Sequence, residues 1–435
     1  MRYFSLRRSS PTVDFREATL RGIAPDGGLY FPKAIPVLPT SWFDELKGKG
    51  KTEIAVDVIK PYVGSCIPDK ELLRICEETV GFDFPLVPVN ENISSLELFH
   101  GPTLAFKDVG ARFMSRCLAW FSRGNEKPVT VLVATSGDTG SAVASGFYGV
   151  EGVEVVILYP SGKVSPAQEL QLTTSGGNIR SLEVTGSFDD CQRMVKEAFL
   201  DYDLKSRMLL TSANSINVAR WLPQQFYYFY ALQQWPHTEP PVISVPSGNF
   251  GNLCSGILAS VSGLGVKHFI AACNSNQVFT SYIHTGVYLP APPVSTLSNA
   301  MDVGDPSNFI RILELFGNKH QSIAEKISSY AISDQLTVQT IQDVFRSRNY
   351  LLDPHGAVAY AALQLYQKMH PEDKGLILET AHPVKFSETV ERVTGQVIQV
   401  PASIQELKKR KKQSTVINPD FQELKQFLLE RVMAV

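Results

Sequence analysis

The sequence has 435 residues, of which 44% are hydrophobic and 19% charged, so the chain is far too apolar to be disordered. At about 150 residues per domain, this length predicts two or three domains. The 41 Lys and Arg residues almost balance the 43 Asp and Glu residues, which argues against a nucleic-acid binder with a broad basic face. Any anion that the chain binds must be bound locally.

The six cysteines are scattered, and none lies in a C-x-x-C pair or near a histidine at metal-ligand spacing. In a chain long enough to form its own core, this favours reduced thiols, without a metal site, over three disulfides. The first residues lack the apolar stretch of a signal peptide, and no apolar run reaches the ~18 residues of a membrane span. We therefore expect a soluble cytoplasmic protein that binds neither membranes nor nucleic acid.

The first 90 residues differ in character from the rest of the chain. A glycine-rich patch spans 22–32, and helical stretches follow around 54–62 and 70–80. We interpret residues 1–90 as a separate N-terminal α+β unit.

From residue 129 to about 400, short apolar runs alternate with turns and with segments of helical spacing. The runs lie at 129–134, 153–159, 242–245, 268–272 and 375–378. Because they show no polar alternation, we expect strands that are buried on both faces in a parallel sheet covered by helices. This is the α/β class, in which ligands bind at the carboxyl ends of the strands.

Two later segments have a helical character. Residues 318–349 are polar and indicate an insertion or outer layer rather than sheet, and residues 401–435 indicate a C-terminal helical tail. The basic run 408–412 within that tail is typical of a solvated helix end, with a localisation or nucleic-acid patch as the alternative.

Lys107 is the first candidate for chemistry. It follows the segment 100–106 (HGPTLAF) and precedes a stretch, 109–121, whose apolar residues recur every three or four positions, as on one face of a helix. The macrodipole at a helix N-terminus disfavours a positive charge and lowers the pKa of a lysine there, and a neutral lysine can attack an aldehyde. A surface lysine that happens to precede a helix is the alternative.

A turn with two glycines lies at 135–140 (TSGDTG), between the run 129–134 and a helical segment. Ser136, Thr139 and the free amides of the helix start offer donors to a carboxylate or phosphate. An ordinary capped strand-to-helix turn is the alternative. The turn lacks the G-x-x-x-x-G-K-[ST] pattern, so an NTPase loop is not supported.

The segment 246–252 (PSGNFGN) occupies the same position after the run 242–245. Backbone amides suited to a phosphate come from Gly248, Asn249, Phe250, Gly251 and Asn252. A helix terminus contributes only ~0.3–1 kcal/mol per charge, whereas micromolar binding needs ~8 kcal/mol. A covalent link or stacking contacts must supply the rest, and Lys107 is the obvious candidate for the link.

Two further segments place polar side chains after strands. The segment 211–220 brings together Asn214, Ser215, Asn217 and Arg220, neutral donors with one guanidinium that suit a phosphate. Thr380 lies just past the run 375–378. The alternative is that the Asn and Ser residues only form a turn and that Thr380 only caps the strand end.

Taken together, these segments resemble the threonine synthase family, pyridoxal-phosphate enzymes of the tryptophan synthase β-like fold (fold type II). The resemblance covers nearly the whole chain, through 25–32 (PDGGLYFP), 98–108 (LFHGPTLAFKD), 135–140, 214–217 (NSIN), 247–252, 353–359 (DPHGAVA) and 380–386 (TAHPVKF). It implies two open α/β domains with a cofactor cleft between them. The large domain would comprise 91–125 and 236–400, with the small domain, 126–235, inserted in it.

The resemblance also implies pyridoxal 5'-phosphate as the cofactor, with Lys107 forming the Schiff base. The residues that would hold the cofactor phosphate are Gly248, Asn249, Phe250, Gly251 and Asn252. Thr380 would contact the pyridine nitrogen. Asp138 would lie by the cofactor ring, a position at which enzymes of the wider fold often have Asn.

For the substrate, the resemblance implies O-phospho-L-homoserine, which reacts with water to give L-threonine and phosphate in the last step of threonine biosynthesis. Ser136 and Thr139 would lie by its carboxylate, and its phosphate would be held by Asn214, Ser215 and Arg220. Lys107, once displaced from the cofactor, would act as base at Cα and then at Cβ. Phosphate would leave from Cγ, and water would add at Cβ. A monomer is expected, as in the microbial branch of the family.

Two alternatives stay open. Another lyase of the same fold, such as a serine or threonine dehydratase, would keep Lys107 and the segment 247–252 but would have no use for Asn214 and Arg220. A non-catalytic protein that binds a phosphorylated amino acid is the second alternative, and the lysine argues against it.

Overall fold

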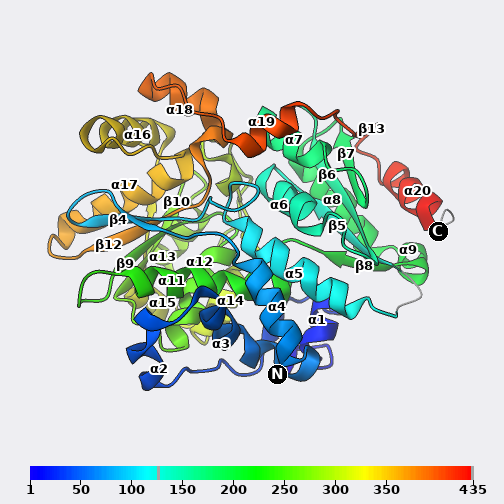
Figure 1. Ribbon diagram of the computed structural model, residues 1–435, viewed down its shortest axis with the longest axis horizontal. Coiled ribbons are helices and arrows are strands. Elements are labelled where there is room, and N and C mark those ends of the chain that lie inside the picture. Colours follow the sequence, from blue (N-terminus) through cyan, green and yellow to red (C-terminus); the bar gives the residue numbers. More distant parts are fainter. Residues whose placement is uncertain (125–127, 433–435) are drawn as a thin grey trace.

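The computed structural model describes residues 1–124 and 128–432. Two open α/β sheets lie on opposite sides of the molecule, the larger on the left and the smaller on the right in Figure 1. The chain crosses from the larger sheet to the smaller one through helix α5 (Lys107–Phe121), which begins between them. The fold is therefore the α/β architecture with two sheets that the sequence predicts.

The larger sheet has six strands in the order β11-β10-β9-β12-β4-β3, and only the β3–β4 pair is antiparallel. The strands are β3 (Leu86–Pro88), β4 (Ile93–Glu97), β9 (Val242–Pro246), β10 (His268–Cys273), β11 (Ile327–Ala331) and β12 (Gly375–Glu379). The central strands β9 and β12 are buried throughout, because helices cover both faces. Strands from the segment 86–97 and from the segment 242–379 thus share one sheet.

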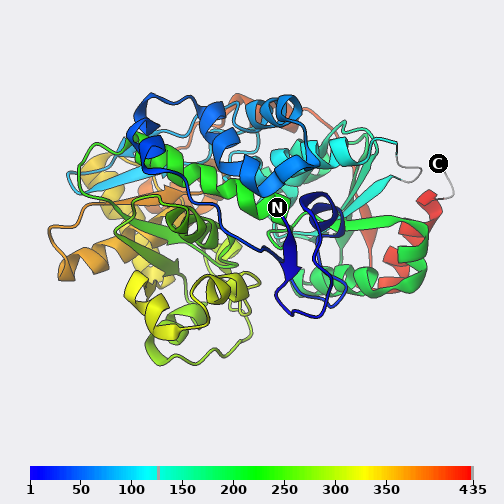
Figure 2. The same cartoon turned by 90° about the horizontal axis from the view of Figure 1, so that it is seen from below.

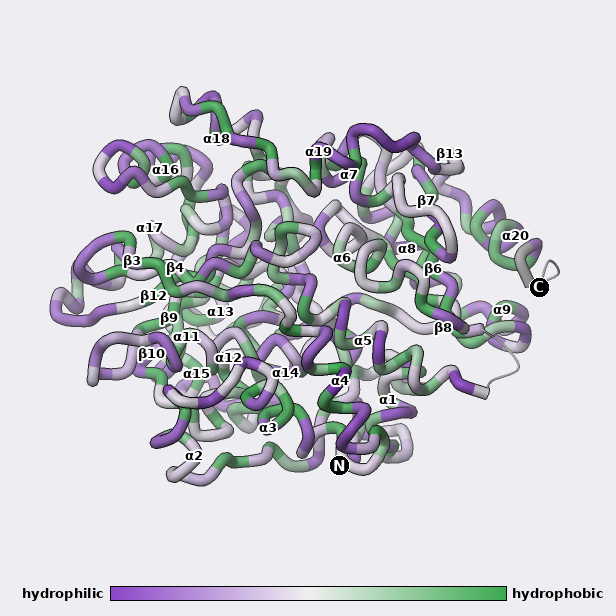
Figure 3. Tube along the Cα trace, viewed as in Figure 1, coloured by the Kyte–Doolittle hydropathy of each residue, from purple (hydrophilic) through white to green (hydrophobic). Residues whose placement is uncertain are grey.

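The smaller sheet has five parallel strands in the order β13-β7-β6-β5-β8. Its strands are β5 (Val129–Ala134), β6 (Val153–Pro160), β7 (Ile179–Val184), β8 (Leu209–Ser212) and β13 (Thr415–Ile417). Hydrophobic side chains dominate β5 and β6, in agreement with the predicted runs (Figure 3).

The structure contains strands outside the predicted runs, among them β4 and β7, and two such strands lie in segments that were expected to be helical or to lie outside the sheet. The segment 318–349, expected to lie outside the sheet, contains β11, which pairs with β10 along five residues. The predicted helical tail contains β13 between two helices, and β13 pairs with β7. Both strands are short and expose part of their length, so neither has the unbroken apolar run by which central strands are recognised.

Helices cover both sheets. The α-helices not yet named are α1 (Phe15–Arg21), α2 (Thr40–Asp44), α3 (Lys51–Val63), α4 (Asp69–Thr79), α6 (Asp138–Phe147), α7 (Pro166–Thr173), α8 (Phe188–Leu200), α9 (Tyr202–Arg207), α10 (Val218–Trp221), α11 (Phe226–Gln234), α12 (Gly251–Val261), α13 (Val278–Thr285), α14 (Phe309–Leu315), α15 (His320–Lys326), α16 (Asp334–Arg348), α17 (Pro354–Met369), α18 (Ser387–Thr394), α19 (Ala402–Lys408) and α20 (Phe421–Val432). Helix α17 packs on β9, β10 and β12, and α8 packs on β5 and β6. Among the described helices, none has the length and apolar character needed to cross a bilayer.

The N-terminal segment packs at the junction of the two halves (Figure 2). It contains the antiparallel pair β1 (Tyr3–Ser5) and β2 (Tyr30–Pro32) as well as α1 to α4. Asn217 fixes it to the loop after β8, because its Nδ2 donates to the carbonyl of Thr19 at 2.9 Å. The helical stretches predicted at 54–62 and 70–80 are α3 and α4.

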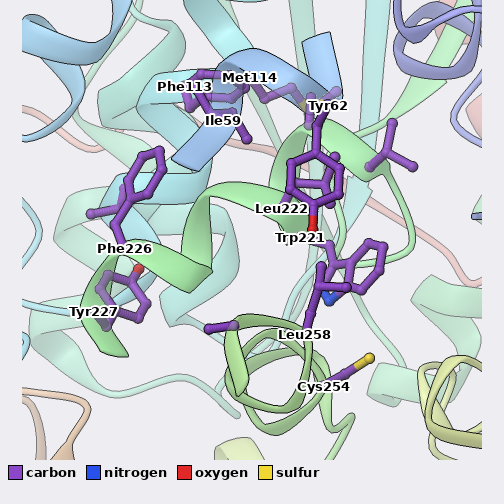
Figure 4. Close-up of a cluster of buried hydrophobic side chains, with 14 of the residues drawn as sticks. Ile59, Tyr62, Phe113, Met114, Trp221, Leu222, Phe226, Tyr227, Cys254 and Leu258 are labelled. Carbon is purple, nitrogen blue, oxygen red and sulfur yellow. The ribbon is translucent and has the colours of Figure 1, made fainter. Parts of the chain in front are cut away.

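A hydrophobic core beneath this junction supports the helices that carry the candidate residues (Figure 4). Trp221 and Leu222 lie between Phe113 and Met114 of α5 and Leu258 of α12, and all five are almost completely buried. Burying a side chain of this size stabilises the fold by about 1.5–3 kcal/mol. The core therefore fixes the start of α5 relative to α10 and α12.

The basic run 408–412 lies where α19 ends, at the surface beside the smaller sheet (Figure 3). Lys412 forms ion pairs with Glu169 and Glu183, each at 2.7 Å. The position at a helix end agrees with the prediction, and the paired acidic residues leave less free positive charge for a nucleic acid.

Candidate active site

The end of β12 and the loop before α5 are joined by backbone hydrogen bonds. The amide of Phe106 donates to the carbonyl of Thr380 at 2.9 Å, and that of His382 donates to Leu104 at 3.0 Å. Tyr227 of α11 donates its hydroxyl to the carbonyl of Phe106. These bonds place Lys107, the first residue of α5, beside the carboxyl end of β12, where open α/β sheets bind ligands.

Lys107 is partly buried, with Nζ 5.4 Å from the centroid of the Phe106 ring. Its pKa is lowered, first by burial and then by the positive charges of Lys385 and Arg220, while Asp138 acts in the opposite direction. The direction agrees with the sequence analysis, and burial is the largest cause. A lysine of lowered pKa is more often neutral and can act as nucleophile or base.

The loop 247–251 forms a cradle of backbone amides after β9. The amides of residues 248–252 donate to no group within 1–124 and 128–432, whereas the Asn252 side chain closes the loop by donating to Pro246 and accepting from Ser247. Asn252 can therefore offer a ligand its amide, but its side chain is already engaged. At Gly248 a Cβ atom would lie 2.7 Å from Cα of Met301, so a side chain there has no room.

The loop 214–217 lies beside this cradle. Nδ2 of Asn308 donates both to Oγ of Ser215 and to the carbonyl of Asn249, each at 3.0 Å. Arg311 of α14 holds the same loop, because its guanidinium donates to the carbonyls of Ser215 and Ile216 at 2.8 and 2.6 Å. The structure thus brings together two of the segments that the sequence analysis predicts as phosphate sites.

Arg220 is a buried cation, and two of its nitrogens have no partner among the described residues. It is 2% exposed, and its Nε and Nη1 form no hydrogen bond with the described residues. Gly110 of α5 permits this position, since a Cβ atom there would lie 2.6 Å from the carbonyl of Arg220. Burial lowers the pKa of Arg220 to about 10, and Tyr227 and Asp108 act in the opposite direction. A buried guanidinium in this state favours an anionic ligand.

The turn 135–140 leads into α6. Oγ1 of Thr135 accepts from the amides of Gly137 and Gly140 at 3.0 and 2.8 Å, which fixes the turn. Ser136 and Thr139 are partly exposed. Their hydroxyls are therefore accessible to a ligand.

Asp138 is buried in the same turn and forms an ion pair that the sequence analysis missed. Its Oδ1 lies 2.8 Å from Nζ of Lys385 and accepts from Nε2 of Gln168 at 2.9 Å. Burial opposes ionisation, but Lys385 and Lys107 hold the pKa of Asp138 well below its ordinary value. Lys385, Asn308 and Arg311 are the residues that sequence reasoning did not find, because each lies far along the chain from the group that it contacts.

A second layer of polar residues lies behind Thr380. Glu379, which is fully buried at the end of β12, accepts from the amide of Asp353 at 2.7 Å, and Asp353 also accepts from the amide of Gly356. A Cβ atom at Gly356 would lie 1.4 Å from Oε2 of Glu379. Burial and the charge of Asp353 raise the pKa of Glu379 well above its ordinary value, so we expect the carboxyl to be protonated at neutral pH.

Replacing Glu379 by glutamine is expected to raise the melting temperature at pH 7.5, with a gain that shrinks toward pH 4.5. The wild-type carboxyl is protonated in the folded state but ionised in the unfolded state above pH ~4.3, so its contribution to stability falls as the pH rises. Differential scanning fluorimetry across this range measures the effect. Glu372→Gln, at an exposed position nearby, is the control, and a gain independent of pH would contradict the protonated state.

The residues around Lys107 fit pyridoxal phosphate. The cradle of free amides suits the phosphate, Lys107 suits the aldehyde, and the buried, hydroxyl-bearing Thr380 directly follows β12. Because the cradle and Lys107 come from different elements that meet only in the fold, the arrangement defines a class of protein, the pyridoxal-phosphate-dependent enzymes of fold type II.

Comparisons with known proteins give the same class and, within that class, one family. A family model described as pyridoxal-phosphate dependent enzyme matches residues 92–380, and models of the threonine synthase N terminus and C-terminal region match 2–80 and 356–428. The chain is 42% identical to the threonine synthase of Serratia marcescens, over 99% of each chain. It belongs to the threonine synthase family, and pyridoxal phosphate is its cofactor.

Solved structures agree over the full length. The crystal structure of threonine synthase from Escherichia coli has a TM-score of 0.92 and 41% identity, with 99% of this chain and 100% of that chain covered. The structure of pyridoxal-phosphate-bound threonine synthase from Brucella melitensis has a TM-score of 0.92 and 33% identity, with 99% of each chain covered.

Proposed function

We propose that this site converts O-phospho-L-homoserine and water into L-threonine and phosphate, with Lys107 holding the cofactor and Arg220 binding the substrate phosphate. The observation that carries this assignment is the buried guanidinium of Arg220, two of whose nitrogens lack a partner among the described residues. A phosphate accepts hydrogen bonds from such a group at several oxygens. Asn214 and Ser215, in the loop that leads to Arg220, would add neutral donors.

When bound, pyridoxal phosphate supplies an aldehyde and a ring that withdraws electrons from the substrate. We assign its phosphate to the amides of 248–252, its pyridine nitrogen to Thr380 and the edge of its ring to Asp138. The ring of Phe250 packs on Phe279 with centroids 4.5 Å apart, and its backbone is left-handed at φ 58°.

Lys107 moves protons in this proposal. Because its pKa is lowered, Nζ is more often neutral and takes the proton from Cα of the bound substrate. The same nitrogen then acts as the base at Cβ, while Arg220 holds the substrate phosphate until the phosphate leaves from Cγ. Ser136 and Thr139 orient the substrate carboxylate from the start of α6.

The experiment is a parallel assay of the purified protein with O-phospho-L-homoserine, L-serine and L-threonine. We expect equal amounts of phosphate and threonine from the first substrate and little 2-oxo acid from the other two. Ammonia and 2-oxo acid from serine or threonine as the main products would favour a dehydratase. Binding of phosphohomoserine without any product would favour a non-catalytic binding protein.

We also propose that the protein is cytoplasmic and monomeric. All six cysteines are free, and five of them are buried, which supports a reducing compartment such as the cytoplasm. A monomeric state, which the family resemblance implies, is part of this proposal.

A further inference from the structure

The buried ion pair between Lys385 and Asp138 connects the two halves of the molecule. Lys385 lies in the short 3-10 helix Pro383–Phe386 that follows β12 of the larger sheet, and Asp138 is the first residue of α6 beside the smaller sheet. Their side chains are 0% and 4% exposed, and Nζ and Oδ1 are 2.8 Å apart.

Stability alone does not account for this pair. Removing two charges from water costs several kcal/mol per ion, and well-packed apolar residues often stabilise a protein as much as a buried pair. Among the described residues, the ammonium of Lys385 forms its single hydrogen bond with Asp138. A lysine kept wholly out of solvent for one partner indicates that its charge or its position is needed at this site.

The pair fixes α6 and α7 against the loop that carries Lys107. Gln168 of α7 donates to the same oxygen of Asp138, and its Oε1 accepts from the amide of Ser165. Gln171, one turn further along α7, donates to the carbonyl of Thr103 at 3.1 Å, close to the start of α5. The position of Asp138 relative to Lys107 is thus set by contacts from three elements.

One negative charge and two positive charges act on the pKa of Lys107. Asp138 favours its protonated form, whereas Lys385 and Arg220 disfavour it. The other ionisable groups on which Lys385 acts are Asp108 of α5 and His382. Lys385 therefore competes with Lys107 for the carboxylate of Asp138.

We propose that Lys385 is a positioning residue for the reaction, which holds Asp138 as an ionised carboxylate at the start of α6 and keeps it from pairing with Lys107. The inference rests on the proposed role of Lys107. Without Lys385, Asp138 would take the ammonium of Lys107 as its counter-ion, and Lys107 would stay protonated to a higher pH. With Asp138 neutralised instead, Lys107 would face cations alone and lose its proton more readily.

The test measures how fast the full-length protein, freed of cofactor, takes up pyridoxal phosphate at pH 6 to 10. Uptake requires the neutral amine of Lys107, which condenses with the aldehyde and releases water. Lys385→Met is expected to move the pH midpoint upward and Asp138→Asn downward, each by about one unit, a size typical of losing one nearby charge. The double variant is expected to return toward the wild-type midpoint, and Lys163→Met, at an exposed position, to leave it unchanged.

Opposite shifts distinguish this role from a purely structural one, which would weaken both single variants without moving the midpoint. Midpoints that do not move, or that move in the same direction, overturn the proposal. If Lys385→Met does not fold, Lys385→Gln, which also removes the charge, takes its place, and an upward shift of its midpoint is still required. Failure of the proposed role of Lys107 is separately visible, because borohydride reduction of the wild-type protein would then label a different lysine.

Discussion

Replacing Lys107 by alanine is expected to remove the visible absorption of the bound cofactor and to lower threonine formation by at least ~10³-fold. A general base is worth about 10²–10⁴-fold, and this lysine also forms the covalent link in our proposal. The measurements are the absorption spectrum of the purified variant and its rate of phosphate release from phosphohomoserine.

The fold should survive this change, because the core below α5 does not depend on the lysine side chain. Circular dichroism and the melting temperature check that point, and Lys163→Ala serves as the matched control at an exposed lysine. Peptide mapping after borohydride reduction of the wild-type protein gives an independent readout. A label on Lys163 or Lys385 would show that the cofactor lysine has been wrongly assigned.

Replacing Arg220 by methionine is expected to raise KM for phosphohomoserine by about tenfold to a hundredfold. Hydrogen bonds to charged groups are worth about 1.5–3 kcal/mol, and the partnerless nitrogens of Arg220 are the strongest donors found for the substrate phosphate. Methionine fills much of the same buried volume. The cofactor absorption should be retained, because Arg220 is not among the residues assigned to the cofactor.

Steady-state kinetics with phosphohomoserine measures this effect, and Arg207→Met, at an exposed arginine, is the control. Arg220→Lys is expected to fall between the wild type and the methionine variant, since lysine keeps the charge but loses the forked donor geometry. An unchanged KM in Arg220→Met would remove the phosphate site from this position. The dehydratase alternative would then gain support, because it has no use for this arginine.

Local pattern was sufficient for most of the central strands. The run 129–134 is β5 without any change of boundary, and the run 375–378 lacks only the last residue of β12. These strands are buried on both faces, so nearly all of their residues are apolar, with Thr130 in β5 and Glu379 at the end of β12 as the polar residues. Strands β4, β7 and β11 were missed because polar residues interrupt them, and β13 because it is only three residues long, so none has the long apolar run of β5.

The domain boundaries stay a prediction. The strands of the larger sheet come from 86–97 and 242–379, which accords with an inserted smaller unit. However, β13 from the C-terminal segment extends the smaller sheet, and α10 packs on α5, α1 and α12. Limited proteolysis would identify the linkers that separate the units.

The sequence by itself determined the α/β class, the positions of Lys107 and of the amide-rich loop 246–252, and the family resemblance, because each depends on residues that are close along the chain. Only the tertiary structure decided which groups face one another. It placed Lys385 on Asp138, left two nitrogens of Arg220 without a partner, engaged the Asn252 side chain within its own loop, and made burial the main cause of the lowered pKa of Lys107. The physical reason is that desolvation and charge pairing depend on separations in space, which local sequence patterns do not contain.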